Sequence, residues 1–283
     1  MALSLENYTE EVREAIAETV EAFHLKVSDE HGNTLSVPAN FQMLNDTPFP
    51  FRGGKASPYE LQSALTAITS EYTPVDRKNL QNLIVAHGLG TDCSNFVYWN
   101  LARIHDRVGA GEYADSVFWD TDEVLELAAI KPGWELGADW QTALKSTAHV
   151  PAGQLAMALG KKPQYLIGTA HMSAAEAVID VPTEEVLPGD VAIFHSIGAA
   201  ATVHVAIVDQ VEHNADSSEV SIWHSLWEAD APEAGVCEST IVMHSNETYT
   251  YSWEFDAHQR LSHSFVRPRA LAALASNATL QYV

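Results

Sequence analysis

The chain has 283 residues and a formal net charge of −23, because 38 Asp and Glu residues stand against only 15 Lys and Arg residues. A chain of this length can bury a sizeable core, as one large domain or two small ones. Its negative field repels nucleic acid and anionic membranes, so we expect neither as a partner.

The hydropathy pattern predicts a chain without membrane insertion. No stretch approaches the roughly 18 apolar residues that a membrane-spanning helix needs. The first residues lack the basic region and apolar core of a classical export signal. We therefore expect a cytoplasmic location, and leave non-classical export open.

Most of the elements predicted before residue 188 are helices. Apolar residues at helical spacing predict helices over residues 8–23, 58–72, 75–87, 115–130, 151–159 and 173–179, and one that begins at Cys93. Alternation around His31-Gly32-Asn33 predicts a hairpin over residues 25–37. Residues 48–54 are predicted to form a turn-rich loop.

From residue 188 the hydrophobic period changes to that of strands. β-Branched and aromatic residues predict strands over residues 191–194, 203–208, 220–223, 240–243, 248–253 and 264–267. Helices followed by a run of strands are typical of an α+β domain with an antiparallel sheet.

Cys93 lies at the head of an apolar helix. Its stripe continues through Val97, Leu101, Ile104 and Val108. Thr91 or Asp92 can cap the helix, which would place the sulfur where backbone amides and the helix dipole favour an anion. Such a position lowers a thiol pKa and favours a nucleophile, whereas the alternative is a buried structural cysteine.

Two histidines on neighbouring predicted strands are candidate partners of Cys93. Alternation places His204, Ala206 and Val208 on one face, which we expect to point toward the Cys93 helix. A hairpin through residues 214–217 would bring His224 beside His204, where it could fix the imidazole tautomer. Ordinary surface or core histidines are the alternative reading.

No cofactor or metal is predicted. The sequence contains no HExxH motif, and neither cysteine has a CxxC partner, so a zinc site has little support. Whether Cys93 pairs with Cys237 is left open.

Several segments, taken in order, resemble the NlpC-type cysteine peptidases, which are papain-like enzymes that act on bacterial cell-wall peptides. The segments are Asp92-Cys93-Ser94, Leu187-Pro188-Gly189-Asp190-Val191, His204-Val205-Ala206-Ile207 and Ile222-Trp223-His224-Ser225. Residues 49–54 faintly resemble the family's upstream aromatic-Gly-Gly segment, although without its tyrosine. Asn95 stands where the family usually has glycine.

The resemblance implies a papain-like fold in which a helix carrying the nucleophile packs on an antiparallel sheet. It implies Cys93 as the nucleophile, His204 as the base and His224 as the orienting residue. Asp92 and Ser94 would help to hold the amino end of a substrate. By the same comparison, residues 1–47 form a lead-in and residues 48–283 the hydrolase domain, with insertions at about 58–88 and 110–181.

The leading functional hypothesis is a cysteine hydrolase that cleaves an amide bond through a thioester. The resemblance implies a cell-wall (murein) peptide as substrate and a γ-D-glutamyl type of bond. The alternatives are an amidase or acyltransferase acting on another substrate, and a catalytically silent papain-like binding protein. The oligomeric state is left open.

Overall fold

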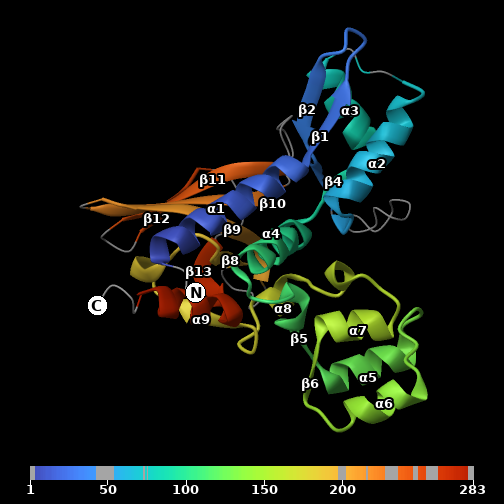
Figure 1. Ribbon diagram of the computed structural model, residues 1–283, viewed down its shortest axis with the longest axis vertical. Coiled ribbons are helices and arrows are strands. Elements are labelled where there is room, and N and C mark those ends of the chain that lie inside the picture. Colours follow the sequence, from blue (N-terminus) through green and yellow to red (C-terminus); the bar gives the residue numbers. More distant parts are fainter. Residues whose placement is uncertain are drawn as a thin grey trace.

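The computed structural model describes residues 4–42, 54–72, 74, 76–196, 202–214, 216–226, 235–244, 248–252 and 261–279. The fold mixes helices with one large sheet, as the α+β prediction requires. In Figure 1 the large sheet and its helices lie in the middle, with a hairpin and two helices at one end and a mostly helical segment at the other. Of the resemblance in residues 49–54, only Gly54 falls within the described residues.

The large sheet has seven strands in the order β12-β11-β10-β9-β8-β13-β7, and every neighbouring pair is antiparallel. The strands are β7 (Val178–Val181), β8 (Val191–Ser196), β9 (Thr202–His213), β10 (Ser217–Leu226), β11 (Gly235–His244), β12 (Tyr249–Tyr251) and β13 (Leu261–Pro268). The predicted strands at 191–194, 203–208, 220–223, 240–243 and 264–267 are confirmed. The one at 248–253 is confirmed over β12, and Trp253 lies outside the described residues.

Helix α4 (Cys93–Val108) begins at Cys93, as predicted, and contacts β9 and β10. The whole predicted stripe is buried, and Asp92 is the N-cap, because its carboxylate accepts the amide of Asn95. Gly109 ends the helix in the left-handed conformation, with φ of 71°, which glycine adopts without a steric penalty. Helix α1 (Leu5–Ala22) packs along α4, and α9 (Arg269–Thr279) contacts α1 and β13.

The two faces of the sheet carry separate hydrophobic clusters. The helix-side cluster joins α1 and α4 to strand residues that include Val191, Val205 and Ile207. The second cluster lies on the alternate strand positions and includes Phe194, Ala206 and Val208 among its members. Strand alternation therefore assigns each residue of β9 to one of two distinct environments.

One end of the molecule is built from the predicted hairpin and two helices. The hairpin consists of β1 (His24–Ser28) and β2 (Thr34–Pro38), which pair antiparallel. It contacts α2 (Pro58–Thr69) and α3 (Arg77–Ala86), so both predicted helices are confirmed within a few residues. Two short parallel strands, β3 (Asn40–Phe41) and β4 (Gly90–Thr91), then lead into Cys93.

The other end is formed by residues between α4 and β7. Its elements are η2 (Tyr113–Asp115), β5 (Phe118–Asp120), α5 (Thr121–Ile130), α6 (Ala138–Leu144), β6 (His149–Pro151), α7 (Ala152–Ala158), η3 (Pro163–Tyr165) and α8 (Thr169–Met172). The helix predicted over 151–159 is confirmed. The one predicted over 115–130 is helical only from Thr121, because residues 118–120 pair with β6.

The helix predicted over residues 173–179 is wrong. Helix α8 ends at Met172, and Val178 begins strand β7, which pairs with β13 at the edge of the large sheet. Val178 and Val181 are buried and Asp180 is exposed, so pairing with β13 outweighs the short helical pattern. No helix in the described part of the chain is long and apolar enough to cross a membrane.

Candidate active site

Cys93 is the first residue of α4, where the chain leaves β4. Only 7% of the residue is exposed, and the sulfur lies against the backbone amides of Val205 and Ser94. Val205 belongs to β9 and directly follows His204. The helix start therefore brings the candidate nucleophile to the strand that carries the candidate base.

The electrostatic balance at the sulfur differs from the expected one. Burial, and to a smaller degree the Asp92 carboxylate, raise the pKa of the Cys93 thiol to about 12. The backbone amides and the Lys55 ammonium lower this pKa, but less than burial raises it. Removing the sulfur from water thus outweighs the helix N-terminus, and the thiol keeps its proton at neutral pH.

The two predicted histidines are brought together. Strands β9 and β10 form the expected antiparallel pair, and His204 Nε2 lies 2.9 Å from His224 Nδ1. His224 Nε2 lies 2.8 Å from Ser239 Oγ on β11, which extends the chain of hydrogen bonds by one residue. Burial lowers the pKa of His204 to about 3 and also lowers that of His224, so both imidazoles are neutral at pH 7.

The side chain of His204 leaves β9 on the face opposite to the one expected. His204 pairs across the strands with Phe194, and their ring centroids are 5.6 Å apart in the second cluster. Val205 and Ile207 instead belong to the helix-side cluster. Within the described residues, no hydrogen bond joins the Cys93 thiol to His204. The sulfur therefore meets β9 at the backbone of Val205 and not at the imidazole of His204.

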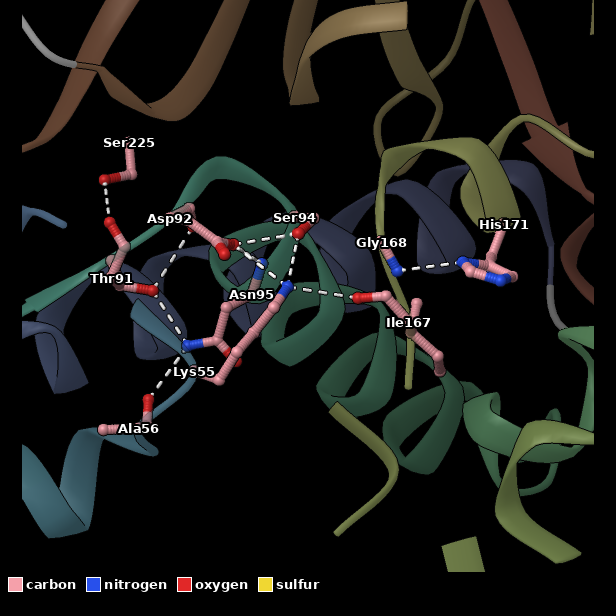
Figure 2. Close-up of polar contacts among 10 residues, drawn as sticks. All are labelled: Lys55, Ala56, Thr91, Asp92, Ser94, Asn95, Ile167, Gly168, His171 and Ser225. Carbon is pink, nitrogen blue, oxygen red and sulfur yellow. Dashed lines mark hydrogen bonds and ion pairs between the residues drawn. The ribbon is translucent and has the colours of Figure 1, made fainter. Parts of the chain in front are cut away.

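A lysine that the sequence analysis did not single out lies beside the cysteine. Lys55 Nζ is 3.2 Å from Asp92 Oδ1 and 3.1 Å from the carbonyl oxygen of Ile167, and it also donates to Ser94 Oγ. Figure 2 shows the three acceptors converging on this ammonium. Asp92 and Ser94, predicted to hold a substrate's amino end, thus bind a cation of the chain itself.

Asn95 anchors the segment that carries Lys55. Its side-chain amide donates to the carbonyl of Ala56 and to Thr91 Oγ1, each at 2.9 Å (Figure 2). Ser225 adds a bond from β10, donating to the carbonyl of Thr91 at 2.8 Å. Asn95 therefore ties the Lys55 segment to the start of α4.

Residues 166–172 close the site from the side of the predicted insertion. Helix α8 contacts both α4 and β9, and Ile167 supplies the carbonyl that binds Lys55. His171 accepts the amide of Gly168 and stacks on Trp119, with ring centroids 4.2 Å apart. Burial and the nearby Lys55 ammonium lower the pKa of His171. The segment between α4 and β7 thus brings a neutral imidazole and a backbone carbonyl close to Lys55.

The sequence held weak signals for the residues that were missed. Lys55 follows Gly54, whose φ of 65° and contact with the backbone of Asp92 leave no room for a side chain. Ser239 lies in a predicted β-rich region but has no motif around it. The two cysteines are not joined to each other, and no described group of three or more His, Cys, Asp or Glu residues is arranged to hold a metal ion.

Comparisons of the chain with models of protein families, with curated proteins and with solved structures found no match in any of the three.

Proposed function

We propose that this chain is a cysteine hydrolase that cleaves an amide bond through a thioester on Cys93. The observation that carries the proposal is the hydrogen bond of 2.9 Å between His204 and His224, one residue along β9 from the strand position that contacts the sulfur. A nucleophile, a base and an orienting group in this order are the parts that nucleophilic catalysis needs.

The hydrogen-bond chain supports His204 as a base in one of its two proton arrangements. If His204 Nε2 donates to His224 Nδ1, then His224 Nε2 donates to Ser239 Oγ, and His204 Nδ1 carries no proton. That nitrogen is then able to accept the thiol proton. In the opposite arrangement, Nδ1 keeps its proton and the base is lost.

The proposed reaction begins from a neutral thiol and a neutral imidazole. The reaction requires a rearrangement on binding of the amide, because the His204 imidazole lies on the other face of β9 in this structure and must come within hydrogen-bond reach of the sulfur. The sulfur attacks the carbonyl carbon as its proton moves to the imidazole. The protonated imidazole gives this proton to the leaving amine, and a thioester remains. Water activated by His204 hydrolyses the thioester and restores the thiol.

The first part of α4 supplies the expected site for the oxyanion. The first backbone amides of a helix have no intrahelical acceptor, and the amide of Cys93 is one of them. Such amides stabilise the negative charge that develops on the carbonyl oxygen during attack.

A cell-wall peptide with a γ-D-glutamyl bond is the substrate that the family resemblance supports. One observation favours a different amide or an acyl-transfer reaction: Lys55 fills the place expected for a substrate's amino end. Wall-peptide fragments and simple acyl amides separate the two when they are compared as substrates by mass spectrometry. Turnover of acyl amides alone would favour the second reaction.

A catalytically silent binding protein remains a second candidate, because the thiol is buried and its pKa is raised. The decisive measurement is the mass of the intact protein after incubation with each amide or with an activated acyl ester. A mass increase equal to the acyl group that disappears on treatment with hydroxylamine supports the thioester. No adduct and no product with any acyl donor would support the silent protein.

Substitution of each cysteine tests the assignment of the nucleophile. Cys93→Ala should abolish hydrolysis and the acyl adduct, whereas Cys237→Ser on β11 should retain both. Circular dichroism and thermal unfolding check that each variant folds. Hydrolysis that survives Cys93→Ala would overturn the proposal.

A further inference from the structure

The ammonium of Lys55 is enclosed by polar groups beside the candidate nucleophile. Its three N–H donors have three acceptors in the structure, which are Asp92 Oδ1, Ser94 Oγ and the carbonyl oxygen of Ile167. Only 15% of the Lys55 side chain and 12% of the Asp92 side chain are exposed. The ammonium is therefore saturated, and water has little access to it.

We propose that Lys55 permanently occupies a cation subsite beside Cys93, so that the substrate group bound next to the reacting carbonyl carries no ammonium. The inference deepens the proposed function and rests on it. It assigns Lys55 as a specificity-determining residue and makes acyl donors that are neutral at this position the substrate class.

The carboxylate of Asp92 explains why the subsite would otherwise select a cation. Asp92 Oδ1 accepts hydrogen bonds from Ser94 Oγ at 2.9 Å and from the amide of Asn95 at 2.6 Å, in addition to Lys55. These bonds hold the charged oxygen in place at the start of α4. Without Lys55, an uncompensated carboxylate would lie next to the nucleophile and attract positively charged substrates.

A substrate ammonium cannot displace Lys55 without a large loss of contacts. The Lys55 ammonium is bound by two separate segments of the chain. Asp92 lies at the start of α4, and Ile167 lies in the segment between α4 and β7. Displacement would bury a lysine or a carbonyl without its partner, which is costly away from water. A substrate ammonium at this position would therefore form no contact with Asp92 and Ser94 that Lys55 does not already form.

The test compares two alkylating probes of similar size that differ in one terminal group, a neutral hydroxyl or a charged ammonium. N-(2-hydroxyethyl)iodoacetamide is neutral, and N-(2-aminoethyl)iodoacetamide carries an ammonium at pH 8. Each forms a carbon–sulfur bond with Cys93 and releases iodide while the thiol proton goes to solvent. The rate constant of each reaction is measured by intact-protein mass spectrometry in a Cys237→Ser background, so that only Cys93 is alkylated.

With Lys55 present, we expect the ammonium probe to react no faster than the neutral one. In Lys55→Ala, the ratio of ammonium to neutral rate constants should rise at least tenfold, because Asp92 is then uncompensated. Adding Asp92→Asn to Lys55→Ala should return the ratio to its starting value. Lys26→Ala is the matched control, since Lys26 forms an exposed ion pair with Glu21, and it should leave the ratio unchanged.

An unchanged ratio in Lys55→Ala, or a tenfold preference for the ammonium probe with Lys55 present, would overturn the inference. If Lys55→Ala does not fold, Lys55→Gln replaces it, because glutamine removes the charge while keeping hydrogen-bonding groups. Alkylation needs no turnover. A protein that shows the expected ratios but hydrolyses no amide would therefore contradict the proposed function and leave the assignment of Lys55 intact.

Discussion

The cysteine side and the histidine side of the candidate site handle charge in opposite ways. Beside Cys93, a formal charge on Asp92 is compensated by another on Lys55, and both side chains are mostly buried. Beside His204, the groups that touch are uncharged imidazoles and a serine hydroxyl, linked at 2.9 and 2.8 Å. One side is an ion pair and the other is a neutral chain of hydrogen bonds.

This difference determines where the reactive proton resides. The compensated ion pair leaves little net positive field at the sulfur, and burial raises the thiol pKa to about 12. Burial lowers the pKa of His204 to about 3, so the imidazole does not hold a proton at rest. A stable thiolate–imidazolium pair is therefore not the resting state, and proton transfer must accompany attack. Substitutions on each side therefore test separately the ion pair beside Cys93 and the neutral hydrogen bonds of His204.

The largest effect is expected on the histidine side. His204→Gln removes the base and should lower kcat/KM for amide hydrolysis about 10²- to 10⁴-fold, the usual contribution of general base catalysis. His195→Gln on β8, where His195 contacts Ser264, is the matched control and should change the rate little. Steady-state kinetics of both variants measure the change in kcat/KM. A His204→Gln enzyme with the original rate would show that another group takes the proton.

Whether the sequence predicts a contact of the candidate site depends on how far apart its residues lie in the chain. The helix at Cys93 and the pairing of His204 with His224 follow from local periodicity and from one hairpin, and both are confirmed. The face of β9 that points to α4 could not be predicted, because alternation defines two faces without saying which one the helix covers. The burial of Val205 in the helix-side cluster settles that question.

The cysteine side depends on contacts between residues far apart in the chain. Lys55 meets Asp92 across 37 residues and Ile167 across 112. No periodicity or motif connects such positions in a single sequence. The raised thiol pKa was missed for the same reason, because the helix start was visible in the sequence and the burial that outweighs it was not. Local order was predictable, and long-range charge compensation was not.

The second effect tests the ion pair on the cysteine side. Lys55→Met should lower the free energy of unfolding by roughly 3 to 5 kcal/mol, because it leaves a mostly buried carboxylate without its partner. The double variant Lys55→Met/Asp92→Asn should recover most of this loss, since asparagine still caps a helix and carries no charge. Urea unfolding followed by tryptophan fluorescence measures both. Equal losses in the single and double variants would mean that packing, rather than charge, makes Lys55 stabilising.

The third effect is a pH dependence of the free energy of unfolding that comes from the histidine side. The pKa of His204 is about 3 in the folded chain and near 6.5 when unfolded, so the unfolded state binds more protons between these values. The contribution of His204 to the free energy of unfolding is present above pH 6.5. It is lost as pH falls toward 3, at about 1.4 kcal/mol per pH unit. His204→Gln should therefore weaken the pH dependence of unfolding between pH 5 and 6 by that amount. Urea unfolding at the two pH values tests it, and identical slopes in both proteins would contradict the neutral buried imidazole.

The smallest effect concerns the last member of the histidine side. Ser239→Ala removes the hydroxyl 2.8 Å from His224 Nε2 and should lower the hydrolysis rate about two- to tenfold, the scale of one neutral hydrogen bond. The loss should appear in kcat more than in KM, because Ser239 acts on His224 and, through it, on the tautomer of His204. Ser221→Ala, three residues before His224 on β10, controls for removal of a hydroxyl and should leave kcat unchanged. If Ser239→Ala lowers stability but not kcat, the hydrogen bond is structural, and the proton arrangement of His204 is set by His224 alone.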